Sequence, residues 1–255
     1  MKARRFLFTF GGLLLLLSLW WALVALLNIP QYLVPRPSSV ASEFFATPLE
    51  FVQHAGRTLS EAFAGFLIAL ATGLIGGCIL YRSVTTREVI LPWTSALQAI
   101  PIVALAPLLV VWCGSGITSK ILMSAIISFF PILTAVLVGF SEVDQDRRLL
   151  FQVYKTSYPQ TLRHLLLPSA LPTIIMGTKI SAGLATVGAI VAEMTGADKG
   201  LGYLLLNATY RMETPRLFVA IILSGVIGWL AYSLPGIVGV LLPKYWESAR
   251  REASL

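Results

Sequence analysis

The chain has 255 residues, of which 56% are hydrophobic and 12% charged, and its formal net charge is +7 at pH 7. Soluble domains contain about 25% charged residues, so a chain this apolar cannot cover a globule with polar side chains. The basic excess could indicate nucleic-acid binding, but membrane proteins concentrate Lys and Arg in their cytoplasmic loops. We therefore expect an integral protein of the lipid bilayer with no nucleic-acid partner.

Uncharged stretches follow one another along the chain. They cover residues 6–28, 62–81, 89–118, 121–141, 180–192 and 217–243. A helix that crosses a bilayer needs about 20 apolar residues. The fifth stretch reaches that length only if residues 165–179 form its beginning. The sequence therefore predicts an all-α polytopic membrane protein with about six transmembrane helices.

The first stretch follows Lys2, Arg4 and Arg5, and a basic start before an apolar run is also typical of a secretory signal. This run is longer than the roughly 7–15 residues of a signal core, and no clean small-x-small cleavage site follows it. We expect an uncleaved transmembrane helix over residues 1–28. A signal peptide is the alternative.

The distribution of basic residues predicts which side each segment faces. If the N-terminus is cytoplasmic, most Lys and Arg residues fall in cytoplasmic segments, in agreement with the charge bias of membrane proteins. Both ends of the chain then face the cytoplasm. The expected parts are a periplasmic segment over residues 29–57, a membrane core over residues 58–243 with a cytoplasmic loop over residues 142–167, and a cytoplasmic tail over residues 244–255. Pro30, Pro35 and Pro37 should keep the start of the periplasmic segment extended.

The second stretch contains small residues that predict close helix packing. They are Gly65, Gly73, Gly76 and Gly77. Cys78 lies in the same stretch and Cys113 in the next, without the spacing of a metal site. We expect both cysteines to be buried structural thiols, with no metal, no cofactor and no disulfide framework.

Prolines interrupt the third and fourth stretches. Pro101 and Pro107 lie in the third, and Pro131 follows two phenylalanines in the fourth. Proline breaks the helical hydrogen-bond ladder, and a membrane protein tolerates the break where protein or a water-filled cavity satisfies the freed carbonyls. We therefore expect these residues, with Gln98 and Phe130, to line a translocation pathway. Packing kinks alone are the alternative.

The fifth stretch is flanked by charged residues that lie within or near the membrane. Lys179 could offer a positive site to an anion, or its long side chain could reach the cytoplasmic interface. Glu193 is a candidate for a gate or a solute contact, and an ion pair or a cap for the following loop is the alternative. Carboxylates deep in the spans would favour an ion-coupled secondary transporter, but Glu61 and Glu193 lie near span ends.

The loop over residues 142–167 begins acidic and turns basic, which suits the dipole of a short helix. Apolar residues recur in it at helical spacing, namely Leu149, Leu150, Val153 and Tyr154. Pro159 then interrupts the pattern, so we expect two short helices at the cytoplasmic face. The apolar face of the first has no obvious partner within the chain, and an exposed apolar patch usually marks an interaction surface.

The run YPQTLRHLLLPSALP, residues 158–172, resembles the coupling segment of binding-protein-dependent ABC importer permeases. Residues 96–133 and 190–208 resemble the nitrate, sulfonate and taurine permease group of that family. With the segment that begins at Thr58, the resemblance covers nearly all of the chain after about residue 50. It implies the type I ABC importer permease fold and a place in the bacterial inner membrane.

The resemblance also implies partners. ATP hydrolysis would come from a separate ABC ATPase, because the chain contains no G-x-x-x-x-G-K-[ST] motif, and no HExxH or G-x-S-x-G motif suggests a catalytic residue. A periplasmic or lipoprotein substrate-binding protein would deliver the solute, and two copies of the chain would form a homodimer. Nitrate, sulfonates, taurine and pyrimidine precursors of thiamine are the solutes that the resemblance suggests. An ion-coupled secondary transporter is the alternative function.

The resemblance places ATPase coupling in the loop and the helix that follows it. The residues concerned are Leu149, Leu150, Val153, Tyr154, Lys155, Arg163 and Pro168. One feature departs from the family, which has two alanines and a glycine where this chain has Leu150, Phe151 and Lys155. The glycine lets helices meet closely or allows a positive φ. The departure implies an altered docking geometry, an adapted ATPase or an inactive paralogue.

Overall fold

The computed structural model describes residues 2–83, 85, 88–89, 92–93, 96 and 100–240. Gln98 and the expected tail over residues 244–255 lie outside the described residues. The described part consists of helices and connections, without strands. The helices are α1 (Lys2–Leu26), α2 (Pro37–Ala46), α3 (Pro48–Arg82), α5 (Ile102–Cys113), α6 (Ile117–Ser141), α7 (Gln145–Val153), α8 (Tyr158–Thr161), the π-helical turn η1 (Leu162–Leu166), α9 (Leu167–Glu193), α10 (Leu201–Tyr210) and α11 (Thr214–Val240).

Four of the described helical segments are long and apolar enough to cross a membrane. They are Pro48–Arg82, Ile117–Ser141, Tyr158–Glu193 and Thr214–Ile237. Two shorter apolar helices, Leu15–Leu26 and Val103–Cys113, lie in the first and third predicted stretches. The prediction of an all-helical polytopic protein is confirmed, and the number of helices agrees roughly with the predicted number of spans.

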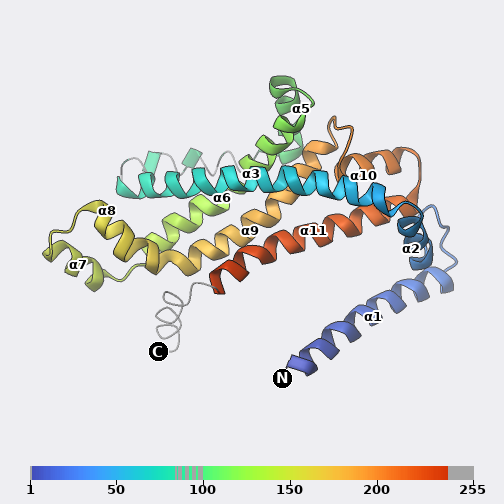
Figure 1. Cartoon of the computed structure of the whole chain (residues 1–255), viewed down its shortest axis with the longest axis horizontal. Coiled ribbons are helices and arrows are strands. Elements are labelled where there is room, and N and C mark those ends of the chain that lie inside the picture. Colours follow the sequence, from blue (N-terminus) through green and yellow to red (C-terminus); the bar gives the residue numbers. More distant parts are fainter. Residues whose placement is uncertain are drawn as a thin grey trace.

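The helix α6 forms the centre of the bundle, between α3 and α9 (Figure 1). Glycines of α3 allow the close approach, because a Cβ added to Gly65 would lie 2.5 Å from Ser124, and one added to Gly77 would lie 2.5 Å from Val136. On the other side of α6, a Cβ added to Gly177 of α9 would lie 2.3 Å from the Cβ of Ala135. The close packing predicted from the glycines of the second stretch is therefore present.

The start of the periplasmic segment was expected to be extended, but the N–H groups of Leu33 and Val34 bond to the carbonyl of Pro30 in a turn, and only the residues just before α2 are extended. Pro37 begins α2 and Pro48 begins α3, because proline suits the first turn of a helix, where its missing N–H costs nothing. The α1 helix lies apart from the bundle and meets it near α2 (Figure 1), where Trp20 stacks on Phe218 of α11 with ring centroids 5.6 Å apart.

The second of the two expected short helices is instead the beginning of a long one. From α8 the chain runs helically through η1 into α9, so that Tyr158–Glu193 forms one span of 36 residues. Pro159 does not interrupt it, because this proline lies in the first turn, after a capping box between Ser157 and Gln160. Pro168 follows the π-helical turn, in which the N–H of Leu167 bonds to the carbonyl of Leu162. The expectation of two separate short helices is therefore wrong.

The prolines of the third and fourth stretches differ in their effect. Pro101 directly precedes α5, which stands out from the bundle (Figure 1) and contains Pro107 within its 12 residues. Pro131 lies inside α6 without ending it. The α5 helix ends at Gly114, whose φ of +80° is a conformation that favours glycine.

Candidate functional site

The α7 helix at one end of the bundle has well-defined ends. Asp144 caps its first turn, since the carboxylate accepts the N–H of Asp146 at 2.7 Å. At its C-terminal end, the N–H of Lys155 bonds to the carbonyl of Gln152 at 2.9 Å and that of Thr156 to the carbonyl of Phe151 at 3.2 Å. This pair of bonds is a Schellman motif, which requires a left-handed residue at its centre.

Lys155 is that left-handed residue, with a φ of +47°. A glycine would adopt this conformation without cost, whereas a residue with a Cβ loses about 1 kcal/mol or more there. A glycine at position 155 would therefore suit this turn better than the lysine does.

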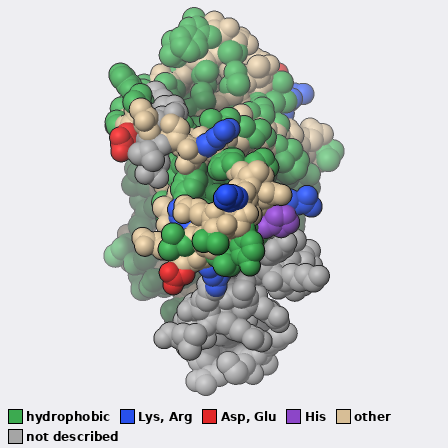
Figure 2. Space-filling view, turned by 90° about the vertical axis from the view of Figure 1, so that its left-hand side faces the viewer, with side chains coloured by type: hydrophobic (Ala, Val, Ile, Leu, Met, Phe, Trp, Pro, Cys, Tyr) green, Lys and Arg blue, Asp and Glu red, His purple; other side chains and the backbone are tan. Residues whose placement is uncertain are grey.

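The apolar residues predicted to couple the ATPase lie together on the outside of α7. Leu149, Leu150, Val153 and Tyr154 are between 53% and 77% exposed. Phe151 turns inward and packs on the core cluster that contains Leu165 and Leu166. Figure 2 looks onto this end of the molecule, where hydrophobic side chains alternate with Lys and Arg and few acidic side chains are visible.

The two remaining coupling residues lie on the next helical segment. Arg163 is exposed in η1, and half-buried Pro168 lies in the first turn of α9. The predicted coupling residues thus lie at one end of the molecule but on two different helical segments, α7 and the segment formed by η1 and α9.

An arginine that no sequence motif marked as functional fixes α7 to the bundle. The Arg148 side chain donates to the carbonyl of Val143 at 2.9 Å, to the carbonyl of Phe140 and to the hydroxyl of Tyr81. Its guanidinium also lies over the Tyr81 ring, 5.7 Å from the centroid. A basic residue one turn into a helix opposes the helix dipole, and this unfavourable position was the available signal that Arg148 binds elsewhere.

At the opposite end of the bundle, buried polar side chains hold the start of α10. The first three N–H groups at this start donate to side chains of other helices. The N–H of Gly200 donates to Nδ1 of His54 at 2.9 Å, and that of Leu201 to Oγ1 of Thr58 at 2.8 Å. The N–H of Gly202 donates to the carboxylate of Glu193 at 2.7 Å. These groups would otherwise be unsatisfied, because a helix cannot pair its own first N–H groups.

Glu193 forms the centre of this outer network, which we define as His54, Thr58, Glu61, Lys120 and Glu193. Its carboxylate is 1% exposed and also accepts the hydroxyl of Thr58 at 2.7 Å. A negative group suits the N-terminus of a helix. The loop cap considered from the sequence is thus a contact that the structure contains, and a gating role for Glu193 stays a prediction.

Lys120, which falls between the third and fourth uncharged stretches, is also buried at this end of the bundle. It lies in the first turns of α6, is 1% exposed, and donates to the backbone carbonyls of Ser115 and Gly196. Glu61, equally buried, accepts from Nε of Arg57 at 2.7 Å. Lys120 therefore connects the turn before α6 to the turn after α9, and Thr58 connects α3 to Glu193 of α9.

The described pathway residues lie in or beside α5, α6 and α9 and differ in exposure. Pro101 and Pro107 are exposed on α5, whereas Phe130 and Pro131 are half-buried in α6. A Cβ on Gly177 of α9 would lie 2.8 Å from the carbonyl oxygen of Pro131, so that proline is a point of close helix contact.

Lys179 of α9 lies against α11. Its ammonium is 4.7 Å from the centroid of the Tyr232 ring, within the range of a cation–π interaction.

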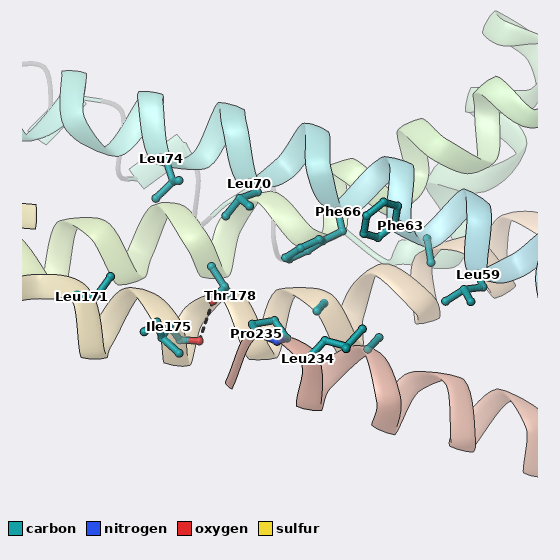
Figure 3. Close-up of a pocket in the computed structure, with 13 residues that line it drawn as sticks. Leu59, Phe63, Phe66, Leu70, Leu74, Leu171, Ile175, Thr178, Leu234 and Pro235 are labelled. Atoms are coloured by element: carbon teal, nitrogen blue, oxygen red, sulfur yellow. Dashed lines mark hydrogen bonds between the residues drawn. The ribbon is translucent and has the colours of Figure 1, made fainter. Parts of the chain in front are cut away.

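An apolar cleft of about 500 Å³ lies between α3, α9 and α11 (Figure 3). Phe63 and Phe66 line it from α3, and Leu234 and Pro235 from α11. Thr178 supplies a hydroxyl, but that hydroxyl bonds to the carbonyl of Ile175 at 2.8 Å and is already satisfied. Such a lining suits an apolar side chain or an acyl chain better than a charged solute.

The two cysteines differ from expectation. Cys78 is half-buried and Cys113 is exposed at the end of α5, so the prediction of two buried thiols is wrong for Cys113. Among the described residues, no group of three or more His, Cys, Asp and Glu side chains could hold a metal ion.

Residues 64–246 match the family of binding-protein-dependent transport system inner membrane components. The chain belongs to this family. It is a permease subunit of an ATP-driven ABC importer, a multi-pass protein of the inner membrane. The predicted family is confirmed, and the ion-coupled secondary transporter is set aside.

Named relatives carry different solutes. The permease is 36% identical to the riboflavin transport permease RibX of Chloroflexus aurantiacus, over 93% of this chain and 89% of the relative. It is 30% identical to the aliphatic sulfonates permease SsuC of Bacillus subtilis, over 93% and 88%. Taurine and nitrate permeases match at lower identity.

Among solved structures, the inward-facing methionine ABC transporter MetNI matches with a TM-score of 0.65 and 17% identity. The match covers 78% of this chain and 99% of that chain. At this identity the likeness concerns the fold, which is the type I ABC importer permease fold.

Proposed function

We propose that this permease receives a small solute from an external binding protein and passes it to the cytoplasm between two copies of the chain. The solutes in the names of its relatives, which include sulfonates, taurine, nitrate, riboflavin and formylaminopyrimidine, define the range. The permease itself contributes no catalytic group, and a separate ATPase subunit hydrolyses ATP.

The observation that carries this proposal is the apolar face of α7. Leu149, Leu150, Val153 and Tyr154 point away from the bundle, although burying them would be favourable. Arg148 holds the helix in place from the other side, so the face is presented on a fixed support. A short helix with anchors at helical spacing, inserted in a groove of a partner, is a common recognition mode. The ATPase is the partner that this end of the permease meets.

Replacing Tyr154 by alanine tests the docking site. Because exposed aromatics act as hot spots, Tyr154→Ala should weaken ATPase binding by about 2 kcal/mol, or roughly 30-fold. Binding is measured by titrating the ATPase onto permease in nanodiscs, together with ATP hydrolysis in proteoliposomes. Leu150→Asp, which places a charge in the same face, should also abolish the stimulated hydrolysis.

Tyr210 provides the matched control, because it is 78% exposed and lies at the other end of the bundle. Tyr210→Ala should leave ATPase affinity unchanged. If Tyr154→Ala and Leu150→Asp bind the ATPase as the unmodified permease does, the dock lies elsewhere.

A further inference from the structure

Lys179 lies level with the middle of α6 and beside the last turns of α11. Its neighbours on α9 mark this depth, because Gly177 lies against Pro131 of α6 and the Ser181 hydroxyl donates to the carbonyl of Ser128. Both α6 residues lie at the centre of the span Ile117–Ser141. Lys179 is also central in its own apolar segment, since the nearest charged residues along the sequence are Arg163 and Glu193.

The surroundings of Lys179 contain an aromatic ring but, among the described residues, no ion-pair partner. The Tyr232 ring lies 4.7 Å from Nζ and stabilises the cation without neutralising it. No carboxylate within the described ranges forms an ion pair with Lys179. The ammonium therefore has no ion-pair partner among the described residues, and its N–H groups can donate to a solute.

Two glycines keep the space beside this pair free. A Cβ added to Gly236 of α11 would lie 3.5 Å from Nζ of Lys179, so a larger side chain there would occupy the position next to the ammonium. On α9, a Cβ added to Gly183 would lie 3.8 Å from the Cβ of Tyr232. We name Lys179, Gly183, Tyr232 and Gly236 the lysine site.

The lysine site lies at the surface of the single chain, where Tyr232 is 38% exposed. A charged side chain at this depth is costly toward lipid, and such residues almost always face other protein or a water-filled cavity. In the proposed dimer, the surface that carries the lysine site must therefore face the partner copy or the path between the copies.

We propose that the lysine site lines the solute path and selects an anion, such as a sulfonate or nitrate, over an uncharged solute such as riboflavin. This inference rests on the proposed function and adds the charge of its solute. A single cation in a narrow path attracts an anion strongly because the surrounding dielectric is low. The Tyr232 ring also attracts the ammonium, and this competing interaction keeps the binding of the anion weak enough for it to leave again.

A thiol placed next to Lys179 tests the proposal without knowledge of the natural solute. Gly236→Cys, in a background of Cys78→Ser and Cys113→Ser, puts this thiol beside Nζ in the full permease–ATPase complex. Its reaction is followed with three methanethiosulfonate reagents that carry an anionic sulfonate, a cationic trimethylammonium or no charge. The ratio of the anionic to the cationic rate should be about tenfold higher with Lys179 than with Lys179→Met.

The matched variant Lys179→Arg keeps the charge and should keep the high ratio, while the uncharged reagent should react similarly in all three proteins. An unchanged ratio in Lys179→Met would overturn anion selection. Reaction with the uncharged reagent alone would place the site against lipid and would overturn its place in the path. In either case, retention of the ATPase by Gly236→Cys would leave the proposed function intact.

Discussion

Lys155 illustrates how a single residue can keep a backbone geometry at a cost. Its φ of +47° allows the two hydrogen bonds that end α7, yet a Cβ is unfavourable in this conformation. The departure from the family glycine therefore concerns the stability of the turn as well as the surface of α7.

Lys155→Gly should raise the free energy of unfolding by about 1 kcal/mol, because glycine adopts the left-handed conformation without steric cost. The change is measured as an upward shift in the thermal unfolding midpoint of the purified permease. Lys155→Ala is the control, since it removes the amine but keeps the Cβ, and it should give no such gain. Equal shifts in both variants would assign the effect to the lost charge. If Lys155 is an adaptation to the ATPase, Lys155→Gly should also lower stimulated ATP hydrolysis.

The partners of some residues were beyond prediction because they are distant in the sequence. Lys120 and Glu193 are both 1% exposed, but the first bonds to carbonyls at positions 115 and 196, and the second to Thr58 and the start of α10. Only the unfavourable position of Lys120 in the first turns of α6 could have drawn attention to it. Local patterns, by contrast, sufficed for the exposed apolar face of α7, since helical spacing alone defines a face.

Among the elements, α10 depends on other helices for its N-terminus. Its N-cap residue is Gly200, which has no side chain to cap the helix and whose φ is +114°. Thr58 of α3 takes over this task for Leu201 and at the same time donates to Glu193. The hydroxyl of Thr58 therefore joins α3, α9 and α10 in one contact.

Thr58→Val removes this hydroxyl while keeping the shape of the side chain. It leaves the buried N–H of Leu201 without its acceptor and Glu193 without one of its donors, so the permease should lose about 2–4 kcal/mol of stability. Thr58→Ser keeps the hydroxyl and should lose much less. Thermal unfolding of the two variants in detergent provides the comparison. Equal losses would mean that the methyl group, and not the hydroxyl, stabilises this end of α3.

The boundaries of the elements were predicted less well than their existence. The sequence predicts an extended chain at Pro37 and an interruption at Pro159, whereas both prolines lie in the first turn of a helix. Proline breaks a helix when a helical turn precedes it and begins one when none does. Whether a helical turn precedes it depends on the tertiary structure. The six apolar stretches were nevertheless sufficient for the fold class, because length and hydropathy determine whether a segment can cross a bilayer.

For the whole molecule, the predicted orientation puts α7 in the cytoplasm and α2 outside. Cysteine labelling of intact cells tests it, with Ser38→Cys on α2 and Gln152→Cys on α7, both exposed positions, in a background without Cys78 and Cys113. An impermeant maleimide should label position 38 in intact cells and position 152 only after the membrane is opened. The reverse pattern would invert the topology.

The continuous helix from Tyr158 to Glu193 gives the permease the geometry of a lever. At 1.5 Å per residue, its 36 residues measure about 54 Å, well beyond the roughly 30 Å of a hydrocarbon core. A rotation of about 10° around its cytoplasmic end would move Glu193 by about 9 Å. Because Glu193 is bonded to Thr58 and Gly202, α10 must travel with the lever, or these bonds must break. A small movement at the ATPase would thereby become a large one at the outer end.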